Sequence, residues 1–539
     1  MSRRRVGIFL FALSLAIRLV WLETYPKVIE NEGTQYARLA ENLLSHHGYV
    51  DMRGPVTMVS PLYSILIAGI SILTGNAELA GRLISLLAGA MLPVLIFLIT
   101  EKVYGMRPGV AGGLLTSLHA ALIAFSAAVY SEILYETLLM AALYYVLITL
   151  EGKGYLAPLC SGAFAGLAYL ARPEGLLYAC VFAAWIVAAT WMTRRRLQIN
   201  LARPVALMAV SVLLALPFMA FITWKTGRLS WEGKSSVNDN IVMRMHAGMT
   251  YQQANTGLGP NLREDGVALE NDQFSYARTH PVPIPIKLRL FTDGWVTRFL
   301  GLSRSFRWAQ FLGSPFLWIL AAIGLASGPW NRLRVAHEVL LSVMAFLSII
   351  VLSTLYFLWS RFLLALLPFA LIWAGHGAAS LYEWLDRKLA VKWHDSPMLR
   401  QFAALIVPVT LSFCLLLASA QGVLELGEIT QGRRVEAKTA GRWIASHFPA
   451  ATVLTIGMVT PYYAGALARV LPYTDDASAA AYLHLKNPDL IILRGDEERQ
   501  RPYLSAWLRT GIPDPCARLA YRVGDQLERS VVVYQWTCR

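Results

Sequence analysis

Long apolar segments recur through the chain, separated by short polar or basic connectors. They lie at about residues 6–22, 79–100, 108–127, 132–150, 155–171, 175–192, 203–223, 308–326, 337–357, 362–380 and 402–420. Such segments can cross the hydrocarbon core of a membrane as α-helices. A shorter apolar block at 61–74 would extend about 20 Å as a helix, which favours a re-entrant or interfacial position. The pattern predicts a polytopic α-helical membrane protein with about eleven transmembrane helices plus interfacial helices.

Basic residues gather in the connectors, and their spacing predicts the topology. The clusters are Lys102 with Arg107, Arg194-Arg195-Arg196 with Arg203, Arg332 with Arg334, and Arg387-Lys388 with Lys392. If residues 61–74 do not cross, all four clusters fall on one side, which the positive-inside rule assigns to the cytoplasm. The first segment follows Arg3-Arg4-Arg5 and precedes no small-residue cleavage site, so we expect it to remain as a span with its N-terminus inside. The C-terminus is then external.

The composition agrees with this class. Of the 539 residues, 56% are hydrophobic and only 15% are charged, which excludes an ordinary soluble protein. The formal net charge of +14 is explained by the basic connectors, so nucleic acid is not expected as a partner and membrane lipids are.

After the last span the pattern changes to short strands and amphipathic helices, typical of a small soluble α/β domain. We therefore divide the chain into a transmembrane domain, 1–421, and an external domain, 422–539. The expected strands are 453–457, 490–493 and 531–534, and the expected helices are 437–448, 461–468 and 477–486. Only Cys516 and Cys538 lie outside the apolar segments, and a hairpin turning at residues 524–525 could bring them together. An external location predicts a disulfide between them.

Two external loops carry the polar chemistry. In the first, residues 23–78, Glu30 and Glu32 follow the end of a span, and residues 36–44 have the spacing of an amphipathic interfacial helix. Carboxylates at that depth need a cation, a proton or a substrate, although an ordinary loop with a charged helix start explains them equally well. The second loop, 225–307, contains His246 and His280 and is either a lid or a linker.

Several short motifs, in this order along the chain, resemble the GT-C superfamily of polyprenyl-phosphate-sugar-dependent glycosyltransferases. They are Thr34-Gln35-Tyr36-Ala37-Arg38, Gly48-Tyr49, Pro61-Leu62-Tyr63, Gly81-Arg82-Leu83, Ser131-Glu132 with Glu136, Arg172-Pro173-Glu174-Gly175, and Ser360-Arg361-Phe362 before Leu367-Pro368. Within the superfamily the chain is similar to the bacterial branch of protein O-mannosyltransferases and the lipid A aminoarabinose transferase. The resemblance extends over most of the chain.

The resemblance implies a sugar donor linked to polyprenyl phosphate, of the undecaprenyl type, and a lipid, glycan or protein acceptor. It also implies a bacterial inner membrane, with the site and the C-terminal domain facing the periplasm. The family's catalytic carboxylate falls on Glu32 if the alignment is based on Tyr36, with Glu30 as an accessory acid. An alignment on an Asp-Glu pair would instead use Asn31, which cannot accept a proton. Val59-Ser60-Pro61-Leu62 departs from the family's Lys-Pro-Pro-Leu element.

The chemistry of glycosyl transfer assigns roles to the remaining candidates. A base must deprotonate the acceptor, and cations must stabilise the departing phosphate. Arg172, Arg361 and Arg82 are candidate phosphate ligands. The alternative for Arg172 and Arg361 is that each is a long basic side chain that snorkels to the membrane interface and anchors the topology. Glu136 is a third candidate acid, although it could simply be a helix N-terminal acid. Accessory candidates are Glu132, Tyr36 and Tyr63. A divalent metal ion is a candidate cofactor, with His246 and His280 as possible ligands or plain loop residues.

Two other classes of function fit many spans and buried charges. A lipid-linked sugar flippase or multispan transporter would place ionisable residues near the midplane of broken helices. The carboxylates here cluster at external helix ends, which favours chemistry at the membrane surface. A catalytically silent scaffold that carries a binding domain is the third possibility.

Overall fold

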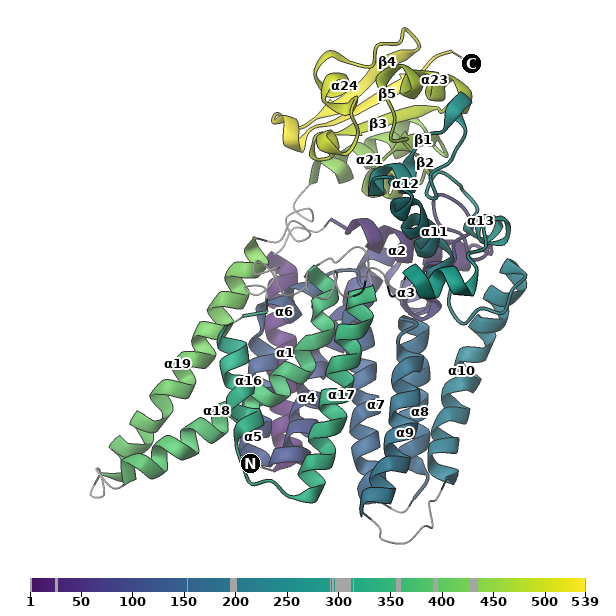
Figure 1. Ribbon diagram of the computed structural model, residues 1–539. Coiled ribbons are helices and arrows are strands. Elements are labelled where there is room, and N and C mark those ends of the chain that lie inside the picture. The colour runs from purple at the N-terminus through teal and green to yellow at the C-terminus, as the bar shows by residue number, and fades with distance from the viewer. Residues whose placement is uncertain are drawn as a thin grey trace.

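A computed structural model describes the chain in several stretches (Figure 1). The described residues are 2–24, 28–152, 154–193, 201–290, 292, 295, 312–313, 315–354, 360–390, 396–425 and 435–538. The basic triplet at 194–196 and Lys392 lie outside them, as do parts of the predicted segments 308–326 and 337–357.

A bundle of apolar helices forms the larger part of the molecule. Its elements are α1 (Arg3–Thr24), α4 (Ala77–Tyr104), α5 (Met106–Leu118), α6 (Ala120–Ser126), α7 (Glu132–Glu151), α8 (Leu156–Ala171), α9 (Gly175–Thr193), α10 (Ala202–Thr226), α16 (Phe316–Ala326), α17 (Arg332–Thr354), η2 (Ser360–Leu366), α18 (Leu367–Ala390) and α19 (Pro397–Leu424). Among the described residues, seven helices are long and apolar enough to cross a membrane, or eight with the bent pair α5–α6 as one span. The other predicted segments fall on the shorter helices α8, α9 and α16.

The break between α5 and α6 is stabilised by a buried arginine of α1. The two helices meet at 55°. Arg18 is fully buried and donates hydrogen bonds to the carbonyl of Ser117, 3.3 Å away, and to Ser126 Oγ at 3.0 Å. These bonds satisfy polar groups near the bend that apolar surroundings would leave unpaired. The bend directs the chain into the segment 127–131, which contributes to the site described below.

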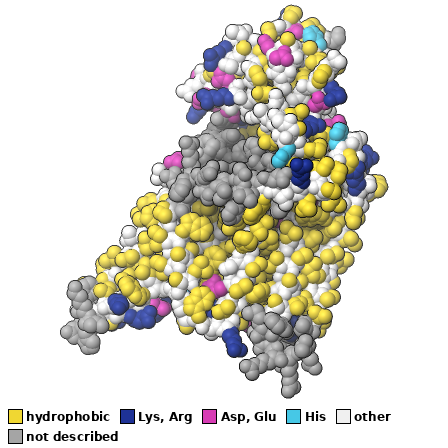
Figure 2. All heavy atoms as spheres, viewed as in Figure 1, with side chains coloured by type: hydrophobic (Ala, Val, Ile, Leu, Met, Phe, Trp, Pro, Cys, Tyr) yellow, Lys and Arg dark blue, Asp and Glu magenta, His cyan; other side chains and the backbone are white. Residues whose placement is uncertain are grey.

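The two ends of the bundle carry different parts of the chain, in the arrangement predicted from the basic connectors. The N-terminus and the α4–α5 and α16–α17 connections lie at one end, and the C-terminal domain lies beyond the other (Figure 1). Hydrophobic side chains form a broad band over the bundle, and charged side chains gather beyond it (Figure 2). Both external loops lie on the side of the C-terminal domain, as the predicted topology requires.

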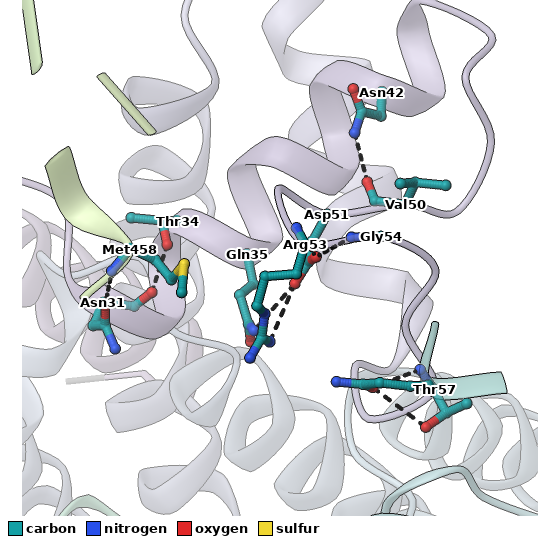
Figure 3. A network of polar contacts seen from close by, with 11 residues as sticks. Asn31, Thr34, Gln35, Asn42, Val50, Asp51, Arg53, Gly54, Thr57 and Met458 are labelled. Carbon is teal, nitrogen blue, oxygen red and sulfur yellow. Dashed lines mark hydrogen bonds and ion pairs between the residues drawn. The ribbon is translucent and has the colours of Figure 1, made fainter. Parts of the chain in front are cut away.

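The first loop contains α2 (Asn31–Leu44) and α3 (Pro61–Thr74). The face of α2 that carries Tyr36, Leu39 and Ala40 is buried. It packs against α3 and α4. The predicted amphipathic helix therefore exists, but its apolar face packs on protein. The buried carboxylate of Asp51 fixes the rest of the loop, since it accepts hydrogen bonds from the N–H groups of Arg53 and Gly54 at 2.7 and 3.2 Å and from Gln35 at 3.2 Å (Figure 3).

The second loop folds into short helices. These are α11 (Lys234–His246), α12 (Tyr251–Thr256), η1 (Pro260–Leu262) and α13 (Gln273–Thr279). The side-chain oxygen of Gln273 accepts a hydrogen bond of 3.0 Å from the N–H of Thr57, so the two external loops contact each other (Figure 3).

The C-terminal domain is a five-stranded mixed sheet with helices. Its elements are α21 (Val435–His447), β1 (Thr452–Thr455), α22 (Val459–Ala464), β2 (Leu467–Val470), α23 (Asp476–Lys486), β3 (Leu490–Arg494), η3 (Gly495–Gln500), α24 (Leu504–Thr510), β4 (Ala517–Val523), η4 (Leu527–Arg529) and β5 (Val531–Trp536). The strand order is β2-β1-β3-β5-β4. Strands β2, β1 and β3 are parallel, and β5 is antiparallel to both β3 and β4.

The three strands expected from sequence are confirmed as β1, β3 and β5, but the helix predicted at 461–468 is partly wrong. The helix ends at Ala464, Gly465 adopts a left-handed conformation (φ 65°), and Leu467–Val470 forms a strand instead. Pairing with β1 in the sheet has outweighed the local preference for a helix. The predicted disulfide between Cys516 and Cys538 is present, beside the β4–β5 hairpin.

The C-terminal domain rests directly on the first external loop. Tyr462 of α22 donates a hydrogen bond of 3.1 Å to Glu41, and Tyr463 donates one of 2.8 Å to Glu78 at the start of α4. Lys438 lies 3.3 Å from Glu78. The predicted boundary at residues 421 and 422 falls in the last turn of α19, which ends at Leu424.

Candidate active site

A small cavity opens at the end of the bundle that faces the external loops. It holds about 40 Å³ and is lined by Glu132, Tyr135, Glu136, Arg172, Glu174, Tyr178, Ser348, Val351, Leu352, Arg361, Phe362 and Ala365. These residues come from α7, the α8–α9 turn, α9, α17 and η2. Five of them are charged, so the cavity has polar walls at the edge of an apolar bundle. Several predicted site residues, separated by more than two hundred positions, therefore share one cavity.

Arg172 is held between two carboxylates. Its Nη1 lies 2.9 Å from Glu132 Oε1, and its Nε lies 3.7 Å from Glu174 Oε2. Arg172 caps the end of α8, and Glu174 follows in the turn before α9. Burial alone would lower the pKa of Arg172, but the two carboxylates outweigh this and raise it. The guanidinium is therefore a permanent cation in the cavity wall.

Arg361 connects the cavity to the first external loop. It forms an ion pair with Glu32 of α2, and its Nε lies 3.5 Å from Glu132 Oε1. Its guanidinium also lies 4.8 Å from the ring centre of Tyr130 and 5.1 Å from that of Phe362, at cation–π distance. The Glu32 side chain keeps 31% of its surface exposed, against 11% for Arg361 and 4% for Glu132. Glu32 is therefore the most exposed of these three side chains and lies at the edge of the site.

The electrostatics around Glu32 favour its ionised form. Burial raises the pKa of this carboxyl, but the positive charges of Arg361 and Lys234 outweigh burial, with a further contribution from Arg172. The pKa is thus lowered from its ordinary value of 4.5. The pKa of Glu174 is lowered as well, because Arg172 and Lys234 oppose the effect of its burial.

Two tyrosines pack next to Glu32: Tyr36 contacts its carboxylate, and Tyr63 contacts the ring of Tyr36. The Tyr36 hydroxyl lies 2.9 Å from Ser131 Oγ and 3.4 Å from Glu32 Oε1. Its ring packs edge-on against Tyr63 at 5.0 Å, and Tyr63 donates a hydrogen bond of 2.8 Å to the carbonyl of Gly81. Burial raises the pKa of Tyr36 far above its ordinary value, so it remains a neutral hydrogen-bond donor. Neither of the two accessory tyrosines predicted from sequence lines the cavity; both pack beside the first external loop.

Glu136 lies one helical turn beyond Glu132 on α7 and lines the cavity. It is 2% exposed, and its Oε2 has no hydrogen-bond partner among the described residues. A buried carboxyl oxygen without a partner is costly, so a ligand that offers a donor or a cation would be bound favourably there.

Glu30 and Arg82 belong to a separate cluster beside the cavity. Glu30 Oε2 accepts a hydrogen bond of 3.0 Å from the N–H of Val129, and burial raises its pKa. Arg82 Nη2 lies 3.0 Å from both Glu78 Oε1 and the carbonyl of Val28. Both side chains are buried, and neither lines the cavity. Their contacts fix the segments that present Glu32 and Ser131.

His246 and His280 lie in the second loop, at the end of α11 and just after α13. Among the described residues, neither belongs to a group of three side chains that could hold a metal ion. The group that has suitable spacing is His484, Asp514 and Cys516, in the C-terminal domain. Cys516 is bonded to Cys538, so its sulfur is not available as a thiolate ligand.

Four polar residues of the site were not singled out from sequence. Tyr178 and Ser348 line the cavity and share a hydrogen bond, and Glu174 pairs with Arg172. Lys234, at the start of α11, contributes positive charge near Glu32 and Glu174. Glu174 lies inside a quoted motif, but no local signal identifies the other three.

Known proteins share parts of this sequence and this architecture. Residues 58–224 match the profile of the family described as dolichyl-phosphate-mannose-protein mannosyltransferase. A sequence comparison with curated proteins finds no significant match. Solved structures of similar fold include the archaeal oligosaccharyltransferase AglB of Archaeoglobus fulgidus in complex with an inhibitory peptide and a dolichol-phosphate. Its TM-score is 0.62 at 13% identity, over 94% of this chain and 71% of that one.

Two further structures extend the comparison. ArnT of Cupriavidus metallidurans bound to undecaprenyl phosphate has a TM-score of 0.56 at 14% identity, over 98% of this chain and 97% of that one. The Archaeoglobus oligosaccharyltransferase in complex with zinc and sulfate has a TM-score of 0.57 at 14% identity, over 98% of this chain and 73% of that one. At identities this low, the structural matches show that the fold is shared and nothing more.

The fold and the family match together define the class of this protein as a multi-pass membrane protein of the GT-C architecture with a C-terminal α/β domain. The family match over residues 58–224 and the shared fold agree with the resemblance to the GT-C superfamily that the short motifs indicated.

Proposed function

We propose that this chain transfers a sugar from a polyprenyl-phosphate donor, of the undecaprenyl type, to a hydroxyl of a lipid, glycan or protein acceptor. The observation that carries the proposal is that two arginines of the cavity wall, Arg172 and Arg361, pair with carboxylates from three separate elements. Glu132 and Glu174 line the cavity, and Glu32 lies beside it. The relatives solved with dolichol-phosphate and undecaprenyl phosphate support the class of donor. We place the site on the periplasmic face of a bacterial inner membrane, because the described connections α4–α5 and α16–α17, which carry basic residues, lie at the opposite end.

Glu32 is the proposed general base. Nearby positive charges favour its ionised form, its side chain is partly exposed, and it pairs with Arg361 of the cavity wall from the first external loop, where an acceptor would approach. The base takes the proton of the acceptor hydroxyl while the acceptor oxygen bonds to the sugar carbon. The bond from that carbon to the phosphate oxygen breaks, and the phosphate leaves with the electron pair.

Arg172 and Arg361 are the proposed ligands of that phosphate. Both are planar guanidiniums at the cavity wall, and such groups stabilise a departing phosphate by paired, charge-assisted hydrogen bonds. We propose that Glu30 and Arg82 act indirectly, by holding the segments that present Glu32 and Ser131.

If the site holds a divalent metal ion, we propose that Glu132 and Glu136 are its ligands. The oxygens of Glu132 and Glu136 are the carboxylate donors that such ions prefer, and Glu136 Oε2 has no hydrogen-bond partner among the described residues. A metal held there would add positive charge beside the departing phosphate. The roles of Glu32, Arg172 and Arg361 do not depend on it.

Purified protein in liposomes, supplied with a polyprenyl-phosphate sugar and a candidate acceptor, tests the function. Release of polyprenyl phosphate that is lost in Glu32→Gln would support a transferase. Redistribution of the intact donor across the bilayer without cleavage would identify a flippase. Neither reaction, with a donor that nevertheless binds, would indicate a scaffold.

A further inference from the structure

Arg361, a proposed ligand of the donor phosphate, is already paired with a carboxylate. It pairs with Glu32 and lies 3.5 Å from Glu132 Oε1. Phe362 and Tyr130 pack against its guanidinium at 5.1 and 4.8 Å, which limits where it can move. The cavity beside it holds about 40 Å³, which suits a few water molecules rather than a sugar phosphate.

This pairing weakens both groups for transfer. A carboxylate that shares an ion pair with a guanidinium is a poor proton acceptor, because the cation stabilises its ionised form. The lowered pKa of Glu32 agrees with this. In turn, a guanidinium already bonded to a carboxylate attracts an anion less strongly. The resting site therefore holds its base and one of its phosphate ligands in a mutual contact that transfer must break.

We propose that the donor phosphate displaces Glu32 from Arg361, so that binding of the donor releases the base. The proposal rests on the function proposed above. In this exchange Arg361 turns from the Glu32 carboxylate to the phosphate oxygens, and Glu32 loses its nearest cation. Glu32 then accepts the acceptor's proton while the phosphate departs on Arg361.

Arg172 is the fixed member of the pair. It has two carboxylate partners, Glu132 and Glu174, and Glu174 is its neighbour in the same turn. Arg361 instead connects α2 in the first loop to η2, more than three hundred residues away. Among the contacts of the described residues, the ion pair with Arg361 joins the proposed base directly to η2, so a phosphate that binds Arg361 acts directly on the base. The expected consequence is ordered binding, with the donor first.

Equilibrium binding of undecaprenyl phosphate to the full chain in lipid nanodiscs tests the exchange. Glu32→Gln removes the competing carboxylate, and we expect it to tighten binding about tenfold although it abolishes transfer. In an Arg361→Gln background the same substitution should leave binding unchanged. Equal tightening in both backgrounds would reflect general electrostatics and overturn the exchange.

A matched variant provides a second readout that does not depend on the folding of Arg361→Gln. Glu174→Gln also removes one negative charge, here from the cavity wall, but leaves the contact between Glu32 and Arg361 intact. We expect it to tighten binding clearly less than Glu32→Gln, and an equal effect would overturn the exchange. If the wild-type chain does not bind undecaprenyl phosphate at all, the proposed class of donor fails, and the exchange fails with it.

Discussion

Asn31 and Glu32 are neighbours in the sequence, but their side chains contact different parts of the molecule. Asn31 Oδ1 accepts a hydrogen bond of 2.8 Å from the N–H of Met458 in the C-terminal domain (Figure 3). Glu32 pairs with Arg361 at the edge of the cavity. Successive residues of a helix point about 100° apart, so the two positions cannot exchange roles by a small movement. This relationship favours the alignment that places the base at Glu32 over the one that uses Asn31.

Replacing Glu32 with glutamine should reduce transfer by about 100-fold or more, because the amide keeps the shape but cannot accept a proton. Turnover of a polyprenyl-phosphate sugar by the purified variant measures the effect, and an unchanged thermal transition shows that the fold is intact. Asn31→Asp in the same protein is the matched control. A carboxylate at position 31 should not restore activity, and restoration would return the base to the alternative alignment.

Glu30→Gln separates a positioning role from a catalytic one. The carboxyl of Glu30 accepts the N–H of Val129, and a glutamine oxygen can accept the same bond. We expect transfer to fall by less than about tenfold, whereas Glu30→Ala should lower both activity and the melting temperature, because it leaves the buried N–H unpaired. A loss in Glu30→Gln as large as in Glu32→Gln would make Glu30 a catalytic acid.

The parts of the fold that depend on local pattern could be predicted from the sequence. The long apolar helices, the strands β1, β3 and β5, and the disulfide each follow from a run of apolar residues, an alternation or a pair of cysteines. The number of crossings does not follow from the pattern alone, since three of the eleven predicted segments fall on the shorter helices α8, α9 and α16. Strand β2 could not be predicted, because pairing with β1 decides the conformation of residues 467–470.

The candidate site likewise has a part that could be predicted from local sequence and a part that depends on tertiary packing. Its acids and arginines could be named as candidates because charges at the ends of spans are costly and therefore informative. Their partners could not be named. The contact between Glu32 and Arg361 depends on how α2 and η2 pack, and the positive charge of Lys234 comes from the second loop, whose path no periodicity indicates.

Arg361→Gln should move the acidic limb of the pH–activity profile to higher pH. Arg361 lowers the pKa of Glu32, so its removal raises that pKa, and the base becomes protonated at a pH where the wild-type base is still ionised. The limb of kcat/KM reports the free enzyme and is the quantity to measure. Arg361→Lys keeps the positive charge and should shift the limb less. An unmoved limb in Arg361→Gln would contradict the role of Glu32 as the titrating base.

The disulfide tests topology and stability together. Cys516 and Cys538 close a loop with a sequence separation of 22 in a domain that rests on the external loops. Closing a loop of this size stabilises a domain by about 3 kcal/mol in the chain-entropy account, so reduction or the double substitution Cys516→Ser/Cys538→Ser should lower the melting temperature of the C-terminal domain. A membrane-impermeant thiol reagent applied to intact cells should label the wild-type chain only after reduction, and should not label the double serine variant. Labelling that needs lysed cells would place the domain in the cytoplasm and overturn the predicted number of crossings, since one span more or fewer reverses the side on which the C-terminus lies.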